Sequence, residues 1–122
     1  MTHPSLWQQG WYRHARALAS PNVGARPAQT EVDLVVIHAI SLPPGEYGGP
    51  HVQSLFTNQL DPKLHPYFES LKDLKVSAHF YIQRGGELWQ FASCDDRAWH
   101  AGESMHLGRS QCNDFSIGIE LE

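Results

Sequence analysis

Residues 34–40, LVVIHAI, are the stretch of this chain that decides its fold. The run is short, continuously apolar and rich in β-branched side chains, which is typical of a strand covered on both faces. We therefore expect a strand at the centre of a sheet. His38 lies near the end of this strand, and because strand side chains alternate it should share a face with Leu34, Val36 and Ile40.

Two later segments predict more of the sheet. Residues 78–91, AHFYIQRGGELWQF, have two apolar-aromatic runs around Gly85-Gly86, the pattern of a hairpin with a two-residue turn at positive φ. Residues 115–122, FSIGIELE, alternate as a strand does. One face of that strand should carry Ile117, Ile119 and Leu121, and the other Gly118, Glu120 and Glu122.

The remaining segments predict two helices and several loops. Apolar residues have helical spacing over 51–58 and 65–74. Turn-forming residues predict loops over 20–31 and 41–50, and residues 92–114 read mostly as loop. The expected class is α+β (α/β-like), with a mixed central β-sheet flanked by helices.

Composition limits the kind of protein this is. A length of 122 residues predicts a single domain over 1–122. The net charge of -4, with acids and bases interspersed, argues against binding nucleic acid. The first residues, MTHPSLWQQGWYRHAR, lack the pattern of a secretory signal, and no apolar run has membrane-spanning length. We therefore expect a cytoplasmic protein with no membrane partner and with Cys94 and Cys112 reduced.

His38 is the first candidate for chemistry. A histidine on a buried strand needs a partner for each ring nitrogen, and either a metal or a backbone carbonyl would serve. A satisfied core histidine is the ordinary interpretation. The loop that follows favours a site, because ligands of open α/β sheets bind at the C-terminal ends of strands.

Glu120 and the segment around Trp99 are further candidates. Gly118 leaves a bare patch beside Glu120, where a buried carboxylate can act as general base or acid, although a solvated carboxylate is the alternative. Trp99 and His100, in a loop, suit a platform for a sugar ring, or else Trp99 anchors the loop. His79 could face the same surface, and Asn113-Asp114 are expected only to form a turn.

Five segments together carry a resemblance. They are VVIHAISLPPGEYGGP (35–50), LFTNQLDPKLHPYF (55–68), VSAHFYIQRGGELWQF (76–91), DRAWHAGES (96–104) and CNDFSIGIELE (112–122). In this order and spacing, the chain from about Gly10 onward is similar to AmpD-type amidases of the zinc amidase and peptidoglycan-recognition-protein superfamily. The resemblance implies that superfamily's fold.

The resemblance also implies an activity. This family uses Zn²⁺ to hydrolyse the amide between the lactyl group of anhydro-N-acetylmuramic acid and L-alanine in muropeptides recycled into the cytoplasm. It implies His38 as the first zinc ligand and Glu120 as the catalytic acid/base. It places Trp99 and Leu121 at the sugar pocket. A monomer that binds anhydro-muropeptide is expected.

The chain also departs from the family pattern. The family's second histidine ligand, aspartate ligand and oxyanion-stabilising lysine follow the segment IGIELE, so the sequence predicts a fold incomplete at its C-terminus and no activity from these 122 residues alone. His79 and His100 are not family ligand positions. Ala39 stands where asparagine is usual, and Lys75 and Gln111 where arginines hold peptide carboxylates. A non-catalytic muropeptide-binding module is the alternative.

Overall fold

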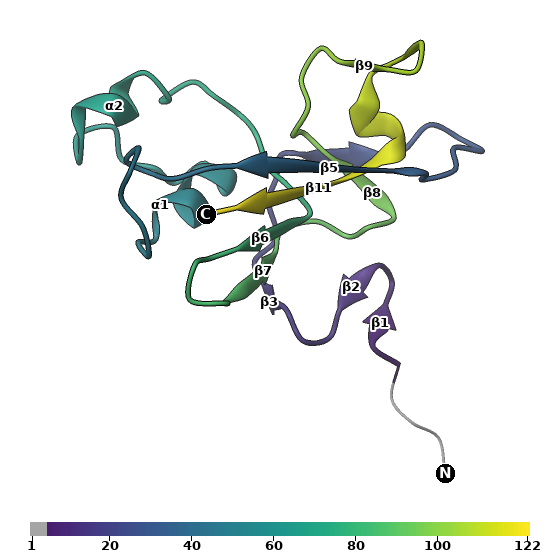
Figure 1. Cartoon of the computed structure of the whole chain (residues 1–122), viewed down its shortest axis with the longest axis horizontal. Helices are drawn as coiled ribbons and strands as arrows, with labels where there is room; N and C mark the ends of the chain where they lie inside the picture. Colours follow the sequence, from purple (N-terminus) through teal and green to yellow (C-terminus); the bar gives the residue numbers. More distant parts are fainter. Residues whose placement is uncertain (1–4) are drawn as a thin grey trace.

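A five-stranded mixed sheet organises the chain, which a computed structural model describes for residues 5–122 (Figure 1). The strand order is β3-β7-β6-β11-β5. Strand β11 runs parallel to both β5 and β6, whereas β6 and β7 are antiparallel, so the predicted mixed sheet is confirmed. The strands are β3 (Arg16–Ala17), β5 (Leu34–Ala39), β6 (Phe80–Ile82), β7 (Leu88–Gln90) and β11 (Ser116–Leu121).

Short strand pairs occur in segments that the sequence predicted as loops. Strand β4 (Val23–Ala25) pairs with β8 (Asp96–Ala98), and β9 (Met105–His106) pairs with β10 (Arg109–Ser110), so the loops over 20–31 and 92–114 were predicted wrongly in part. The β4–β8 pair joins segments distant in sequence and shows no local alternation. A hairpin of β1 (Trp7–Gln8) and β2 (Trp11–Tyr12) and a 3-10 helix, η1 (Cys112–Phe115), complete the elements.

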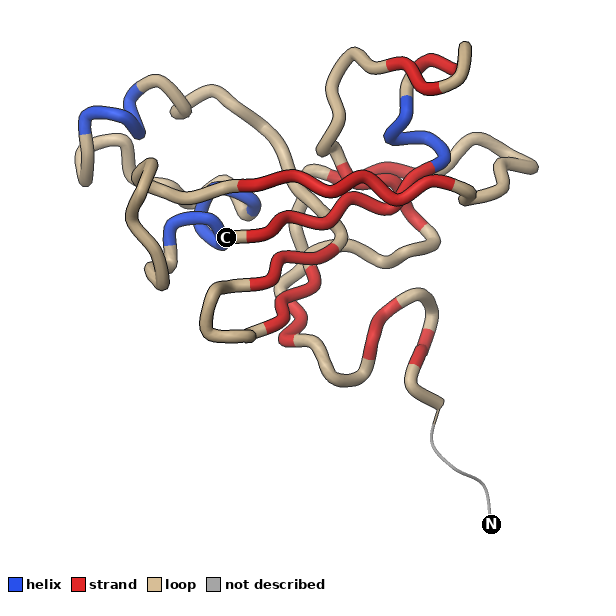
Figure 2. Tube along the Cα trace, viewed as in Figure 1, coloured by secondary structure: helices blue, strands red, loops and turns tan. Residues whose placement is uncertain are grey.

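Two helices flank the sheet, both shorter than predicted (Figure 2). Helix α1 (His51–Phe56) ends where Asn58 takes a left-handed φ of 59°. Helix α2 (Pro66–Glu69) begins after His65, whose ring accepts a hydrogen bond from the Tyr67 N–H, and gives way to turns after one helical turn. Neither these nor any other helix in residues 5–122 is long and apolar enough to cross a bilayer.

The hydrophobic core lies between these helices and the sheet. Leu55 and Phe56 of α1 and Phe68 of α2 pack with Tyr81 and Phe91, and all five are buried. The rings of Phe56 and Phe91 meet edge to face with centroids 5.1 Å apart, a favoured aromatic geometry. This packing fixes the helices against the carboxyl ends of the strands.

Strand β5 does not have the central, doubly covered position that its sequence predicts. Within the described chain it is an edge strand of the sheet. Val35 and Ile37 are 57% and 55% exposed, and Leu121 beside them on β11 is 41% exposed. The central position was predicted wrongly, because a β-branched apolar run shows that a strand forms but not which strands lie beside it. The exposed outer face agrees with the expectation of a fold that is incomplete at its C-terminus. His38, Leu34 and Val36 do share the half-buried face.

The hairpin between β6 and β7 has a three-residue loop rather than the predicted two-residue turn. The Gln83 N–H donates to the Glu87 carbonyl at 3.0 Å, so these residues still pair. Only Gly86 of the glycine pair has positive φ, at 94°. A three-residue loop commonly ends in one left-handed residue, and glycine takes that conformation without strain.

Candidate functional site

Strands β5 and β11 place His38 and Glu120 side by side. The two strands are parallel, and in their register Glu120 lies opposite His38 and Gly118 opposite Val36. Neighbouring side chains on one face of paired strands are within contact distance. The pair lies at the carboxyl ends of both strands, where ligand sites of open α/β sheets form.

Glu120 carries a buried carboxylate at the wall of a cavity. Its side chain is 8% exposed, and burial raises its pKa to about 7. One carboxylate oxygen, Oε2, has no hydrogen-bond partner within residues 5–122. Glu120 and His100 line a cavity with Ala39 and with apolar side chains from α1, α2 and the loops, among them Leu42, Leu55, Tyr67 and Leu71. A carboxylate in such a place can accept and return a proton near neutral pH.

His100 lies directly over Gly118. A Cβ built on Gly118 would be 2.4 Å from Cγ of the His100 ring, so only glycine leaves room for the imidazole. His100 Nδ1 is 3.1 Å from His38 Nε2, and His100 Nε2 is 3.0 Å from Ser116 Oγ. Burial lowers the pKa of His100 to about 3, which keeps the ring neutral.

His79 supports the same patch of backbone. Its Nδ1 accepts a hydrogen bond from the Gly118 N–H at 3.1 Å, and its Nε2 is 2.8 Å from the Asp96 carbonyl, to which it donates. These two contacts require the neutral Nε2–H tautomer. Burial lowers the pKa of His79 to about 4, consistent with that neutral ring.

Asn113 and His100 have roles that the sequence did not predict. Asn113 Oδ1 accepts hydrogen bonds from the backbone N–H groups of His100 (3.1 Å) and Ala101 (2.9 Å), so it does more than form a turn. The His100 ring turns inward toward Ser116 and lines the cavity of Glu120, whereas Trp99 lines a separate hollow. One feature of the sequence could have indicated the position of His100. Ser116, Gly118 and Glu120 alternate on one strand face, and the small Gly118 leaves room there for a ring.

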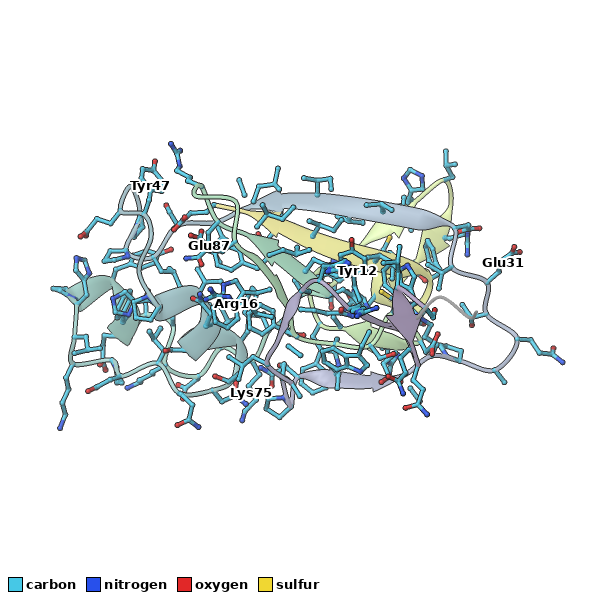
Figure 3. All side chains as sticks on the ribbon, turned by 90° about the horizontal axis from the view of Figure 1, so that it is seen from below. Tyr12, Arg16, Glu31, Tyr47, Lys75 and Glu87 are labelled. Atoms are coloured by element: carbon cyan, nitrogen blue, oxygen red, sulfur yellow. The ribbon has the colours of Figure 1, made fainter. Side chains whose placement is uncertain are left out.

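The structure does not gather every predicted substrate residue around one cavity. Ala39 lies opposite Leu121 in the β5–β11 register, and Leu121 lines a separate hollow with Tyr47. Trp99 is 38% exposed and lines another hollow with Gln111. Lys75 is exposed and lies at the lower edge of the view in Figure 3, whereas Tyr47 lies at the upper left.

The donor set does not make a metal centre by itself. Across residues 5–122 there is no group of three histidine, cysteine, aspartate or glutamate side chains that could hold a metal ion. His38 and His100 are close, but both His100 ring nitrogens already have partners. A hydrolytic zinc needs three protein ligands, so these side chains do not fit a complete zinc site.

Parallel strands of the mixed sheet thus bring His38 beside Glu120, which is buried at a cavity. The N-acetylmuramoyl-L-alanine amidase family model matches residues 28–122, and the chain belongs to this family.

Within this family, the chain is similar to the AmpD amidases. The chain is 53% identical to the 1,6-anhydro-N-acetylmuramyl-L-alanine amidase AmpD of Citrobacter freundii, over 96% of this chain and 63% of that protein. It is equally similar to AmpD of Escherichia coli K12, of which it covers 64%. A crystal structure of a Se-Met AmpD derivative superposes with a TM-score of 0.93 at 52% identity, covering 96% of this chain and 65% of that one. The chain thus spans somewhat under two thirds of these relatives.

Proposed function

We propose that this protein hydrolyses the amide bond between anhydro-N-acetylmuramic acid and L-alanine of muropeptides, a reaction of cell-wall recycling. The names of its relatives supply the substrate. The observation that carries the proposal is Glu120, buried at a cavity, in register with His38 at the ends of two parallel strands.

Glu120 is the proposed general base and acid. Its pKa of about 7 allows it to take a proton from the attacking water and to return it to the departing amine. His38 is proposed to contribute one ligand to Zn²⁺, which when bound would polarise the amide carbonyl and activate water. Because residues 5–122 do not form a complete zinc site, we propose that the 122 residues alone do not turn over substrate.

The other predicted residues are proposed to hold substrate. The exposed indole of Trp99 offers an apolar face to the sugar ring. Ala39 lines both the cavity of Glu120 and the neighbouring hollow that Leu121 lines. Lys75 offers charge to a peptide carboxylate, but an ammonium lacks the two-pronged fork of an arginine. The protein is proposed to act in the cytoplasm as a monomer, with no nucleic-acid or membrane partner.

A non-catalytic muropeptide-binding module is the second candidate. It is favoured by one observation, namely that the described side chains offer a cavity but no three-donor metal group. A binding module would retain muropeptide without cleaving it.

One experiment separates the two candidates. The protein as its gene encodes it is mixed with anhydro-muropeptide; bound zinc is measured by mass spectrometry, and released peptide by liquid chromatography. The amidase proposal expects about one zinc per chain and free peptide. Muropeptide binding without zinc and without free peptide would overturn it in favour of the binding module.

A further inference from the structure

The carboxylate of Glu122 joins two loops that are far apart in the sequence. Its Oε2 accepts a hydrogen bond from the Gly48 N–H at 2.6 Å, and its Oε1 accepts one from the Arg84 N–H at 3.0 Å. Hydrogen bonds to a carboxylate are stronger than those between neutral groups. The Arg84 guanidinium also lies over the Tyr47 ring, with Cζ 3.6 Å from the ring centroid, a favourable cation–π contact. These four residues, here called the Glu122 clasp, tie the loop after β5 and the β6–β7 loop to the end of β11.

The loop after β5 has a defined shape of its own. The Gly45 N–H donates to Ser41 Oγ at 2.9 Å, and the Glu46 N–H donates to the Pro43 carbonyl at 2.9 Å. Gly48 follows with a left-handed φ of 82°, a conformation that glycine takes without strain. Because these internal bonds hold the turn together, fixing Gly48 to Glu122 also fixes the position of the turn.

This loop forms part of the wall of the cavity around Glu120. Ser41, Leu42 and Pro44 line that cavity together with Glu120. Glu122 follows Glu120 by two residues at the end of β11, so the two side chains leave the chain on the same face. One short segment therefore carries the proposed general base and also holds the wall that faces it.

We propose that Glu122 is a positioning residue that, through Gly48 and Arg84, sets the distance between Glu120 and the loop wall of the cavity and thereby the fit of the substrate. The inference rests on the proposed function, which supplies the muropeptide as the ligand. Contacts with this wall do not involve the bond that breaks, so they stabilise the bound substrate and the transition state alike. The effect is therefore expected on KM rather than on kcat.

Amide exchange with solvent, followed by NMR, tests the clasp on the protein as its gene encodes it. In Glu122→Ala, the Gly48 and Arg84 N–H groups lose their acceptor and should exchange at least about tenfold faster, which corresponds to the loss of one hydrogen bond to a charged group. Glu122→Gln keeps one acceptor oxygen and should give intermediate rates, and it keeps the test valid if Glu122→Ala fails to fold.

Kinetics and binding of the same variants test the positioning role. For anhydro-muropeptide, we expect KM and the calorimetric Kd of Glu122→Ala to rise about tenfold while kcat stays within about twofold of wild type. Glu87→Gln is the matched control, because Glu87 is exposed and lines one hollow with Glu122 and Tyr47 (Figure 3). It removes the same charge and should leave the exchange rates, KM and Kd unchanged.

The proposal is overturned if the Gly48 and Arg84 amides exchange at the wild-type rate in Glu122→Ala, or if KM and Kd rise equally in Glu87→Gln. A loss of kcat with an unchanged KM would contradict it as well. A wild type that binds muropeptide but releases no peptide overturns the proposed function alone, and turnover with a Kd indifferent to Glu122 overturns the positioning role alone. A wild type that neither binds nor cleaves muropeptide overturns both.

Discussion

Gly118 is the residue on which the arrangement of the site depends most. It lies between Ser116 and Glu120 on β11, under the His100 ring, and its N–H is held by His79. We expect Gly118→Ala to lower the free energy of unfolding by about 1–3 kcal/mol, because overpacking a filled space forces side chains or backbone to shift. Urea denaturation measures this. Gly49→Ala is the control, since a Cβ there meets only ordinary contacts; equal losses in both variants would contradict the account.

His79 should make stability depend on pH. Its pKa falls from 6.5 in the unfolded chain to about 4 in the fold, chiefly through burial, so the unfolded state takes up the proton first as pH falls. The stabilisation is complete above pH 6.5 and is lost as pH drops toward 4, by on the order of 3 kcal/mol.

Unfolding midpoints measured between pH 7.5 and 4 test this expectation. In His79→Asn the acid-dependent loss should be smaller than in wild type, although His100, whose pKa is also lowered, acts in the same direction. An identical pH dependence in the variant and in wild type would show that His79 is not the source.

At the scale of elements, β5 has two faces with different roles. Its inner face carries His38, and its outer face exposes Val35 and Ile37. We expect Val35→Thr with Ile37→Thr to reduce binding of a hydrophobic dye, because apolar surface is removed while β-branching is kept. Stability should change by less than about 0.5 kcal/mol for each surface substitution. Val36→Thr, on the half-buried face, is the control and should lower the free energy of unfolding more than either surface substitution does. An unchanged dye signal in the double variant would contradict this assignment of faces.

Elements with a local signal could be predicted, and elements made by distant pairing could not. The runs at 34–40 and 115–122 gave strands because composition and alternation act within a few residues. The β4–β8 pair and the edge position of β5 depend on segments far away in the chain, which no local pattern contains. The hairpin was predicted, but its loop length was wrong because Gly85-Gly86 suits both loop types.

At the scale of the whole molecule, the sequence could predict only those residues of the candidate site that lie on strands. His38 and Glu120 lie on strands whose faces follow from alternation, and parallel pairing then sets them side by side. The position of His100 depends on a loop that folds back over Gly118, held by Asn113. This packing of the loop on Gly118 is a tertiary contact, which spacing along the sequence does not predict. From the sequence alone, the His100 ring could therefore be interpreted as part of a sugar platform.

The central claim is that Glu120 performs proton transfer in muropeptide hydrolysis. The most direct measurement compares the release of peptide from anhydro-muropeptide by wild type and Glu120→Gln, using the protein as its gene encodes it. We predict that kcat falls by about 10²–10⁴-fold in the variant, the usual contribution of a general acid–base group, while muropeptide binding and the unfolding midpoint stay close to wild type. A variant that releases peptide at the wild-type rate would contradict the account.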